Sequence, residues 1–324
     1  MIPHRNIIKD TGRILFWYPL RWLLLLMPFS IISVIGNFLG RLDYLFSGSE
    51  RIKKMARNMA HVFNFNTNER ELKKIIRKNL QNHCKNVLEF VKYPQLNNNN
   101  IKKILTFEGI DILNKELTKG RGVILATAHF GAKQLLQVGL GLKGYKINQI
   151  HYHMSEEELT YVQKRVSQKQ RIKIEEKIPA TFIPANSFLR SAFDCLKKNE
   201  ILVMAADGIG LPEHMKKGYT PFKFLGKSML FPSNIPSLAK RTGSSILPIF
   251  VIRQKDNKHK IMIKHPININ SQSEIDITLK FIKILENYIL QYPYLWEFWE
   301  EFEEGTLIVA SDEQKTTVGG SLDT

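Results

Sequence analysis

The first long feature of the chain is an apolar stretch that runs from Trp22 to Leu39 without a charged residue. Its length matches the about 17–25 residues that a membrane-spanning helix needs. Arg21 precedes the stretch, Arg41 follows it, and aromatic residues gather at its start, as in an interfacial aromatic belt. The pattern predicts a membrane anchor within residues 1–47.

The same stretch admits a second interpretation, because Pro19 and Pro28 would interrupt a helix. Apolar runs of this length also occur in buried helices. A buried or re-entrant hairpin that belongs to the domain core is therefore the alternative. The sequence leaves open whether the anchor spans a bilayer or only embeds in it.

Residues 69–93 carry the next pattern, which predicts an amphipathic helix with a strongly basic face. Between Arg51 and Lys103 there are 13 Lys and Arg residues against 3 Glu residues, a net charge of +10. Apolar residues recur at helical spacing and turn the basic ones outward, among them Lys73, Lys74, Arg77 and Lys78. Such a face attracts anionic lipid at about 1 kcal/mol per basic residue near the surface. A basic face that is merely solvated is the simpler alternative.

From Gly120 onward, short apolar runs alternate with helical patterns. The predicted strands are 123–128, 146–153, 201–206, 246–253 and 260–265. The predicted helices are 131–142, 156–171, 187–198 and 236–242. This alternation predicts an α/β fold with a mixed, largely parallel sheet flanked by helices. We expect it to cover residues 48–304, including helix 69–93, and we expect the small and polar residues 305–324 to form a disordered tail.

Composition and charge narrow the class of partner. The chain has 44% hydrophobic and 24% charged residues, as folded globular proteins do, and its two cysteines exclude a disulfide scaffold. A formal net charge of +17 favours an anionic partner. No zinc-finger, RNP-type or homeodomain pattern accompanies this charge. We therefore expect anionic membrane lipid or an acidic carrier protein as partner, and no nucleic acid.

The residue best suited to chemistry is His129, which directly follows the predicted strand 123–128. Ligands of open α/β sheets bind at the carboxyl ends of the strands. Imidazole can accept a proton near neutral pH, and Gly131 allows close approach of a ligand to the backbone. A packed histidine with a structural role is the alternative.

Residues 128–134 read AHFGAKQ and resemble the H-x-x-x-x-D/E motif of the glycerolipid acyltransferase superfamily. More narrowly, they resemble the H-F-G-N-W-E block of the lauroyl and myristoyl acyltransferases of lipid A biosynthesis. Four later segments are similar to further blocks of that family, in the same order: 188–200, 201–207, 221–226 and 237–248. The resemblance extends to about Trp299, within a Trp-rich segment similar to the one that closes the family pattern.

This resemblance implies transfer of a fatty acyl group from a thioester of acyl carrier protein or CoA to a hydroxyl of a glycolipid such as a lipid A precursor. His129 would act as general base, and an acidic partner would orient its ring. The thioester is a co-substrate, so no cofactor or metal ion is expected. The implied location is the cytoplasmic face of the inner membrane.

The resemblance also assigns roles to further residues. Asp207 falls where the family carries an acid after the later strand, and Arg165 where it carries an arginine suited to an anionic group or an oxyanion. The residues themselves add two expected contacts with substrate: Gly131, which allows close approach to the backbone, and Lys133, which lies beside the site and favours an anionic headgroup. From the residues alone, Arg165 could be an exposed residue of a charged helix, and Asp207 a turn-forming aspartate.

The chain departs from the family motif at its acidic position, which is Gln134. The carbonyl oxygen of glutamine can accept the ring N–H, but it carries no charge to stabilise an imidazolium. Three outcomes follow: a slower acyltransferase, one in which Asp207 or Asp194 replaces the missing acid, or a protein that binds lipid or acyl chains without turnover. Acidic residues also follow Trp299, where the family tends to be basic, which bears on acceptor recognition.

Overall fold

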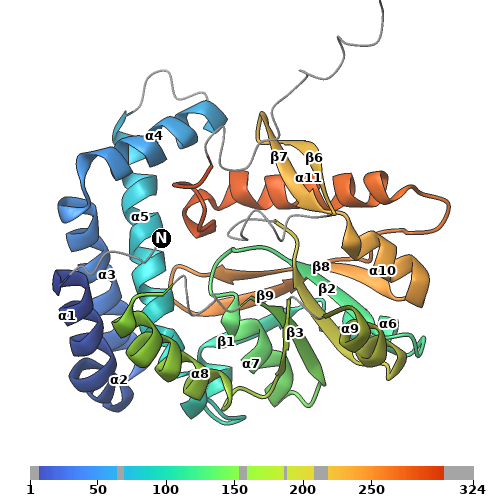
Figure 1. The fold of residues 1–324 in the computed structure, drawn as a ribbon, viewed down its shortest axis with the longest axis horizontal. Helices are drawn as coiled ribbons and strands as arrows, with labels where there is room; N and C mark the ends of the chain where they lie inside the picture. Colours follow the sequence, from blue (N-terminus) through green and yellow to red (C-terminus); the bar gives the residue numbers. More distant parts are fainter. Residues whose placement is uncertain (1–6, 64–68, 153–158, 186–187, 208–217, 303–324) are drawn as a thin grey trace, which may run out of the picture.

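The computed structural model of the protein describes residues 7–63, 69–152, 159–185, 188–207 and 218–302 (Figure 1). The tail predicted for residues 305–324 lies outside these ranges. The described chain forms a central sheet with helices on both faces and a separate group of helices along one side.

The group along one side, which we call the N-terminal helices, covers residues 7–46. It consists of α1 (Ile7–Leu15), the π-helical η1 (Phe16–Leu20), α2 (Arg21–Leu26) and α3 (Phe29–Phe46). Met27 and Pro28 are extended, and α3 runs back along the helices that precede it (Figure 1). Leu24 and Ile32 form a small core of their own with Leu88.

Helix α3 is long and apolar enough to cross a membrane, judged by length and composition, and it is the one helix of the described residues that meets this test. The stretch predicted from Trp22 to Leu39 is nevertheless not one helix, because the chain reverses at Met27 and Pro28. It forms a helical hairpin, as the alternative interpretation required. The hairpin is not buried in the core, however, since Trp22 and many other apolar side chains are exposed.

Two helices join this group to the sheet, α4 (Ser49–Phe63) and α5 (Glu69–Phe90). Helix α5 confirms the amphipathic helix predicted for 69–93, with Ile76 and Leu80 buried and the predicted basic residues exposed. Helix α3 packs closely along α5. A β-carbon on Gly36 would lie 2.5 Å from Cγ of Lys85, and one on Gly40 would overlap the backbone of α5.

The central sheet has seven strands in the order β1-β9-β8-β2-β5-β3-β4. Their bounds are β1 (Leu105–Glu108), β2 (Val123–Thr127), β3 (Ile147–His151), β4 (Thr181–Pro184), β5 (Ile201–Ala205), β8 (Ser245–Arg253) and β9 (His259–Ile263). Neighbouring strands are parallel except for the antiparallel pair β8 and β9. This confirms the mixed, largely parallel sheet. All residues of the central strand β2 are buried, as expected where both faces are covered.

Each face of the sheet has its own hydrophobic core. On one face lie α6 (Ile110–Leu117), α7 (Gln134–Leu142) and α8 (Lys169–Glu175), which follows the π-helical η5 (Gln163–Gln168). On the other face lie α9 (Phe188–Lys197), α10 (Asn234–Thr242), α11 (Glu274–Gln291) and a hairpin of β6 (Tyr219–Phe224) and β7 (Lys227–Pro232). Alternate residues of β2 contribute to the two cores, as the period of a strand requires.

Short 3₁₀ turns complete the chain: η2 (Tyr93–Gln95), η3 (Ile101–Lys103) and η7 (Pro293–Leu295). Two predicted helices differ from the observed ones. The helix predicted for 131–142 begins only at Gln134, because the residues before it form a turn. Of the helix predicted for 156–171, the first part lies outside the described residues, and the helical segment continues to Glu175.

Candidate active site

The candidate site lies at the carboxyl ends of β2 and β5, which are parallel neighbours. Thr127 and Ala205 are paired in register, and the amide of Ala206 donates to the carbonyl of Thr127 at 2.7 Å. His129 follows β2 and Asp207 follows β5, so the register brings these two residues to the same edge of the sheet. This is the edge at which open α/β sheets bind their ligands.

The side chain of Asp207 contacts His129 twice. Its Oδ1 lies 2.8 Å from Nδ1 of the imidazole, and its Oδ2 accepts a hydrogen bond from the backbone N–H of His129 at 2.6 Å. Asp207 is fully buried, whereas 23% of the His129 side chain is exposed. The carboxylate is thus enclosed behind the ring, while the ring itself can be reached from outside.

The environment of Asp207 determines the tautomer of His129. Burial by itself would raise the pKa of Asp207, but the adjacent His129 and the two hydrogen bonds outweigh burial and lower it. The carboxyl group is therefore ionised at neutral pH and can only accept hydrogen bonds. Nδ1 must then carry a proton, which leaves the lone pair of Nε2 available as a base.

Gly131 shapes the turn that follows His129. Its φ is +61°, and a β-carbon there would overlap the carbonyl oxygen of Val251, so only glycine fits. Its amide donates to the carbonyl of Leu295 at 2.8 Å, and its carbonyl accepts from Nδ2 of Asn86 at 3.0 Å. The turn is thus held on both sides by hydrogen bonds to distant parts of the chain.

The closing Trp-rich segment forms one wall of the site. The amide of Glu297 donates to the carbonyl of His129 at 2.9 Å, and the Phe298 ring lies 4.4 Å from the imidazole ring, centroid to centroid. Phe130 forms a β-bridge with Trp296, and both side chains are fully buried. The segment thus holds the backbone of His129 and covers its ring on one side.

A buried charged network supports the turn at Gly131 through Asn86. Arg253 donates to both oxygens of Glu89, at 2.6 and 2.9 Å, and to Oδ1 of Asn86 at 2.8 Å. His259 Nε2 lies 3.0 Å from the same carboxylate. Burial would raise the pKa of Glu89, but Arg253 and His259 lower it to about 2. The bond from Arg253 orients the amide of Asn86 so that its nitrogen faces Gly131.

The other predicted site residues have different positions relative to this pair. Gln134 begins α7 and is partly buried, and within the described residues its side chain forms no hydrogen bond with His129. The acid that contacts the ring is Asp207 instead. Lys133 lies 3.4 Å from a carboxylate oxygen of Glu297 and contributes to the lowered pKa of Asp207. Arg165 is exposed on η5, with its guanidinium 5.9 Å from the Tyr161 ring centre, and none of the described contacts joins it to His129.

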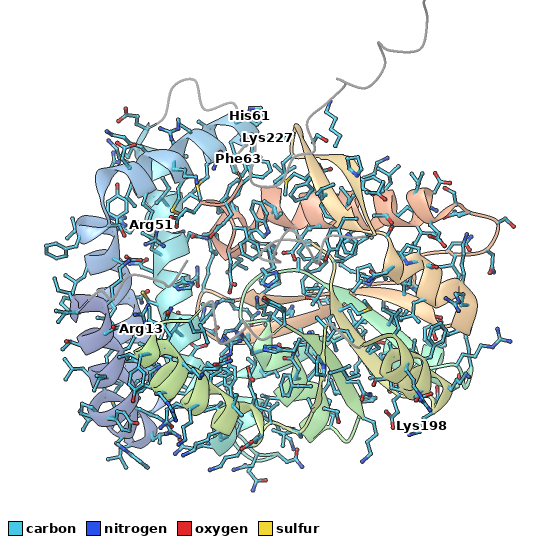
Figure 2. The ribbon with its side chains drawn as sticks, viewed as in Figure 1. Arg13, Arg51, His61, Phe63, Lys198 and Lys227 are labelled. Atoms are coloured by element: carbon cyan, nitrogen blue, oxygen red, sulfur yellow. The ribbon has the colours of Figure 1, made fainter. Side chains whose placement is uncertain are left out.

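A polar pocket of about 150 Å³ lies beside the Phe298 ring, between α4, α5 and the Trp-rich segment. Its polar lining combines amides with charged groups: Arg51 (labelled in Figure 2), Asn79, Asn82, His83, Asn86, Glu297, Glu300 and Glu301. Arg51 is held in place by Glu300 at 2.8 Å and by Asp43 at 3.0 Å.

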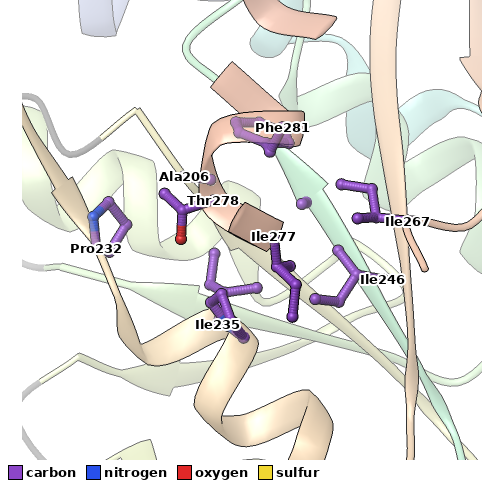
Figure 3. A pocket seen from close by; sticks show the side chains of 10 residues that line it. Ala206, Pro232, Ile235, Ile246, Ile267, Ile277, Thr278 and Phe281 are labelled. Carbon is purple, nitrogen blue, oxygen red and sulfur yellow. The ribbon is translucent and has the colours of Figure 1, made fainter. Parts of the chain in front are cut away.

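A second, apolar pocket lies next to Ala206, the residue before Asp207 (Figure 3). It is lined by Ala126, Ala206, Pro232, Ile235, Pro236, Ile246, Ile267, Ile277, Thr278 and Phe281. Its volume is only about 20 Å³, close to the minimum for a single water molecule. It borders the site with hydrocarbon side chains, but in this conformation it cannot hold a fatty acyl chain.

No group of three or more His, Cys, Asp or Glu side chains is placed to hold a metal ion within the parts of the chain that the structure describes. His151 lies on β3 and its ring contacts that of Phe182, whereas His153 lies outside the described residues.

The model of a family described as bacterial lipid A biosynthesis acyltransferase matches residues 9–300. No curated protein matches the chain. The matched range includes His129, Asp207 and the Trp-rich segment.

The chain belongs to this family. Membership confirms the resemblance seen in residues 128–134 and in the later blocks, and it makes the chain an acyltransferase of lipid A biosynthesis. In this chain, the acid that contacts the histidine comes from the end of a neighbouring strand.

Proposed function

We propose that this lipid A acyltransferase moves a fatty acyl group from a thioester, of acyl carrier protein or CoA, to a hydroxyl of a glycolipid such as a lipid A precursor, with His129 as general base. One observation carries the proposal. His129 and Asp207 form a hydrogen-bonded pair at the ligand-binding edge of the sheet, and the histidine side of the pair can be reached from outside.

The proposed step uses only groups of this chain and the two substrates. Nε2 of His129 takes the proton from the acceptor hydroxyl as its oxygen attacks the thioester carbonyl carbon. The carbon–sulfur bond breaks, and the thiolate that leaves takes the proton back from Nε2. Asp207 holds the ring by Nδ1 and stabilises the imidazolium between these two transfers. No cofactor takes part.

Asp207 supports turnover in spite of the glutamine at position 134. A charged partner is needed to stabilise an imidazolium, and Asp207 supplies a buried carboxylate at 2.8 Å. Gln134, the first residue of α7, is then not needed as the partner of the imidazole and can contact the substrate or the start of α7. This favours an active enzyme over the alternative, a family member that binds lipid or acyl chains without turnover.

The polar pocket is suited to the hydrophilic headgroup of the acceptor. It lies directly beside the Phe298 ring that packs on His129, so a bound headgroup would extend a hydroxyl towards the base. Amide and carboxylate groups, which line it, are the usual partners of sugar hydroxyls. We assign contacts with the substrate also to Lys133 and Gly131, and we assign an anionic group of a substrate to Arg165.

We propose that the enzyme acts at the cytoplasmic face of the inner membrane, with residues 1–47 as anchor and residues 48–304 as the acyltransferase domain. Anionic membrane lipid is the proposed partner of its basic surface. The formal net charge of +17 supports this assignment, because a positively charged protein is attracted to anionic lipid. The same charge suits an acidic carrier protein as donor.

Acyl transfer from a labelled acyl thioester to a lipid A precursor tests the proposal directly. We expect His129→Ala to lower the rate at least about 10²-fold, the usual contribution of general base catalysis. His265→Ala is the matched control, because His265 is an exposed histidine that follows β9. Equal rates for wild type and His129→Ala would remove His129 from the mechanism. Acyl-chain binding by a wild-type protein that shows no turnover would support the alternative function.

A further inference from the structure

The N-terminal helices expose an unusual amount of apolar surface. Thirteen of the nineteen exposed large hydrophobic side chains of the described residues lie between Ile7 and Phe46. They include Trp22 at 61%, Leu26 at 85% and Phe38 at 59% exposure. A patch of this kind on a folded protein marks an interaction surface.

The charges of this surface are complementary to an anionic bilayer. Between Ile7 and Phe46, the exposed charged residues are Lys9 and Arg41, both positive. The two acids of this range are not exposed, since Asp10 pairs with Arg13 (labelled in Figure 2) at 2.8 Å and Asp43 pairs with Arg51. An apolar surface with cations and without exposed acids fits anionic lipid.

The packing of α3 limits how this surface can meet a membrane. Along its length, α3 is covered on one side by α5, which approaches it closely at Gln81 and Lys85. Glu89 is part of the buried network with Arg253, and α5 is packed on the sheet domain. If α3 crossed the bilayer, these polar groups would lie at the depth of the hydrocarbon, where charged side chains are costly.

The position of the charges on α3 leads to the same conclusion. Its uncharged part runs from Phe29 to Gly40, because Arg41 and Asp43 follow. Twelve residues at 1.5 Å per residue extend about 18 Å, against a hydrocarbon core of ~30 Å. The uncharged part therefore reaches little more than halfway across.

Lys92 holds the hairpin against the domain in a single orientation. Its ammonium group donates to the backbone carbonyls of Leu24, Leu25 and Met27, at 3.3, 2.9 and 2.5 Å. Leu24 and Leu25 lie at the end of α2 and Met27 directly follows it, and the carbonyl of Leu24 also accepts the amide of Met27 at 3.2 Å. The apolar surface thus keeps a constant position relative to the sheet and to His129.

We propose that the N-terminal helices lie within one leaflet of an anionic bilayer as an in-plane hairpin and do not cross it. The inference rests on the membrane association proposed above and specifies its geometry. In this arrangement the apolar side chains enter the leaflet, α5 and the sheet domain stay in water, and both sides of the hairpin face the same compartment.

Cysteine labelling in cells tests the topology. Thr11→Cys on α1 and the matched control Thr118→Cys on the sheet domain, each in a full-length chain with both native cysteines changed to serine, are treated with a membrane-impermeant maleimide. A periplasmic single-cysteine protein serves as the positive control. We expect both variants to be labelled only after lysis. Labelling of Thr11→Cys in intact cells, with Thr118→Cys protected, would overturn the in-plane hairpin and leave membrane association standing.

Flotation with vesicles of phosphatidylglycerol and phosphatidylethanolamine tests the surface itself. We expect Trp22→Glu and Phe38→Glu each to lower the vesicle-bound fraction at least fivefold. Leu189→Glu, on α9, is the matched control because Leu189 is 56% exposed but lies outside the N-terminal helices. Wild-type protein that fails to float would overturn both the association and the hairpin. A dimer in solution that Trp22→Glu dissociates, with flotation unchanged, would assign the surface to a second copy of the chain.

Discussion

The carboxylate of Asp207 contacts both the ring and the backbone of His129, at 2.8 Å from Nδ1 and 2.6 Å from the amide nitrogen. One side chain therefore fixes the ring orientation, the tautomer and the start of the following turn. Replacing it affects all three, which makes it the most informative position in the candidate site.

We expect Asp207→Asn to lower kcat by about 10²-fold or more. The amide keeps the shape of the side chain but cannot stabilise an imidazolium, and its nitrogen can donate to Nδ1 and so favour the wrong tautomer. In the serine-protease triad, the equivalent change lowers kcat about 10⁴-fold. Steady-state acyl transfer measures the effect, and a circular dichroism spectrum equal to that of the wild type excludes unfolding. A change in kcat below threefold would contradict the role of Asp207.

We expect Gln134→Glu to change kcat by no more than about threefold. Nδ1 of His129 is already occupied by Asp207, so a new carboxylate at position 134 has no N–H of that ring to accept. The double variant Asp207→Asn with Gln134→Glu separates two possibilities. Activity equal to that of Asp207→Asn alone supports the assignment, whereas recovery to the wild-type rate would show that position 134 can supply the acid.

We expect Asn86→Leu to lower kcat about tenfold, in addition to any rise in KM from the loss of a pocket amide. Asn86 is a positioning residue, because it donates to the carbonyl of Gly131 and does not touch the imidazole. Asn82→Ala is the matched control on the same helix and the same pocket, since its amide donates to Lys78 and Tyr294 instead. For that variant we expect a rise in KM with kcat retained. Equal effects of both variants on kcat would argue against a special role for Asn86.

We expect Gly131→Ala to abolish most of the activity, and Gly120→Ala to retain it. Both glycines have positive φ, at +61° and +72°, so both variants share the backbone strain of about 1–2 kcal/mol. They differ in the room available to a β-carbon. At Gly131 it would overlap the carbonyl of Val251, whereas at Gly120 no atom lies within 4 Å of it. The melting temperature and the acyl-transfer rate of the two variants therefore separate the effect of backbone strain, which both share, from the effect of displacing the turn, which only Gly131→Ala does.

We expect Glu89→Gln to lower the free energy of unfolding by about 3–5 kcal/mol at pH 7, because it leaves Arg253 buried without a counter-charge. The pKa of Glu89 is lowered from 4.5 to about 2, so its stabilisation is complete above pH 4.5 and is lost as the pH falls from 4.5 towards 2. In Glu89→Gln, the free energy of unfolding should not show this decrease between pH 4.5 and pH 2. Glu108→Gln, which removes an exposed pair with Lys260, should cost less than about 1 kcal/mol.

Much of the fold could be predicted from the sequence, because its buried strands are continuous apolar runs. The predicted strands 123–128 and 201–206 correspond to β2 and β5, and helix 236–242 corresponds to α10 with Gly243 in the left-handed conformation after it. β1 and β4 have only four residues each and a weak alternation, so no local pattern distinguishes them from loops. The strand order depends on long-range pairing, which periodicity does not encode.

The candidate site was predictable only in part. His129 could be found because it ends an apolar strand, and Asp207 was recognised as a possible substitute acid. Its pairing with His129 depends on the register of β2 against β5, which no local motif contains. The network of Asn86, Glu89 and Arg253 had no sequence signal, since Glu89 lies in a basic helix that reads as a solvated surface.

The separation of His129 and Asp207 along the chain has a consequence for how such enzymes are recognised. A pattern that demands an acid five positions after the histidine would count this chain among members that have lost their chemistry. In this structure the carboxylate beside the imidazole belongs to Asp207, which follows a neighbouring strand, so the proposed pair does not depend on an acid at position 134. Surveys for inactive relatives in this family should therefore rely on the residues that lie near the imidazole in the structure, and not only on the residues that follow the histidine in the sequence.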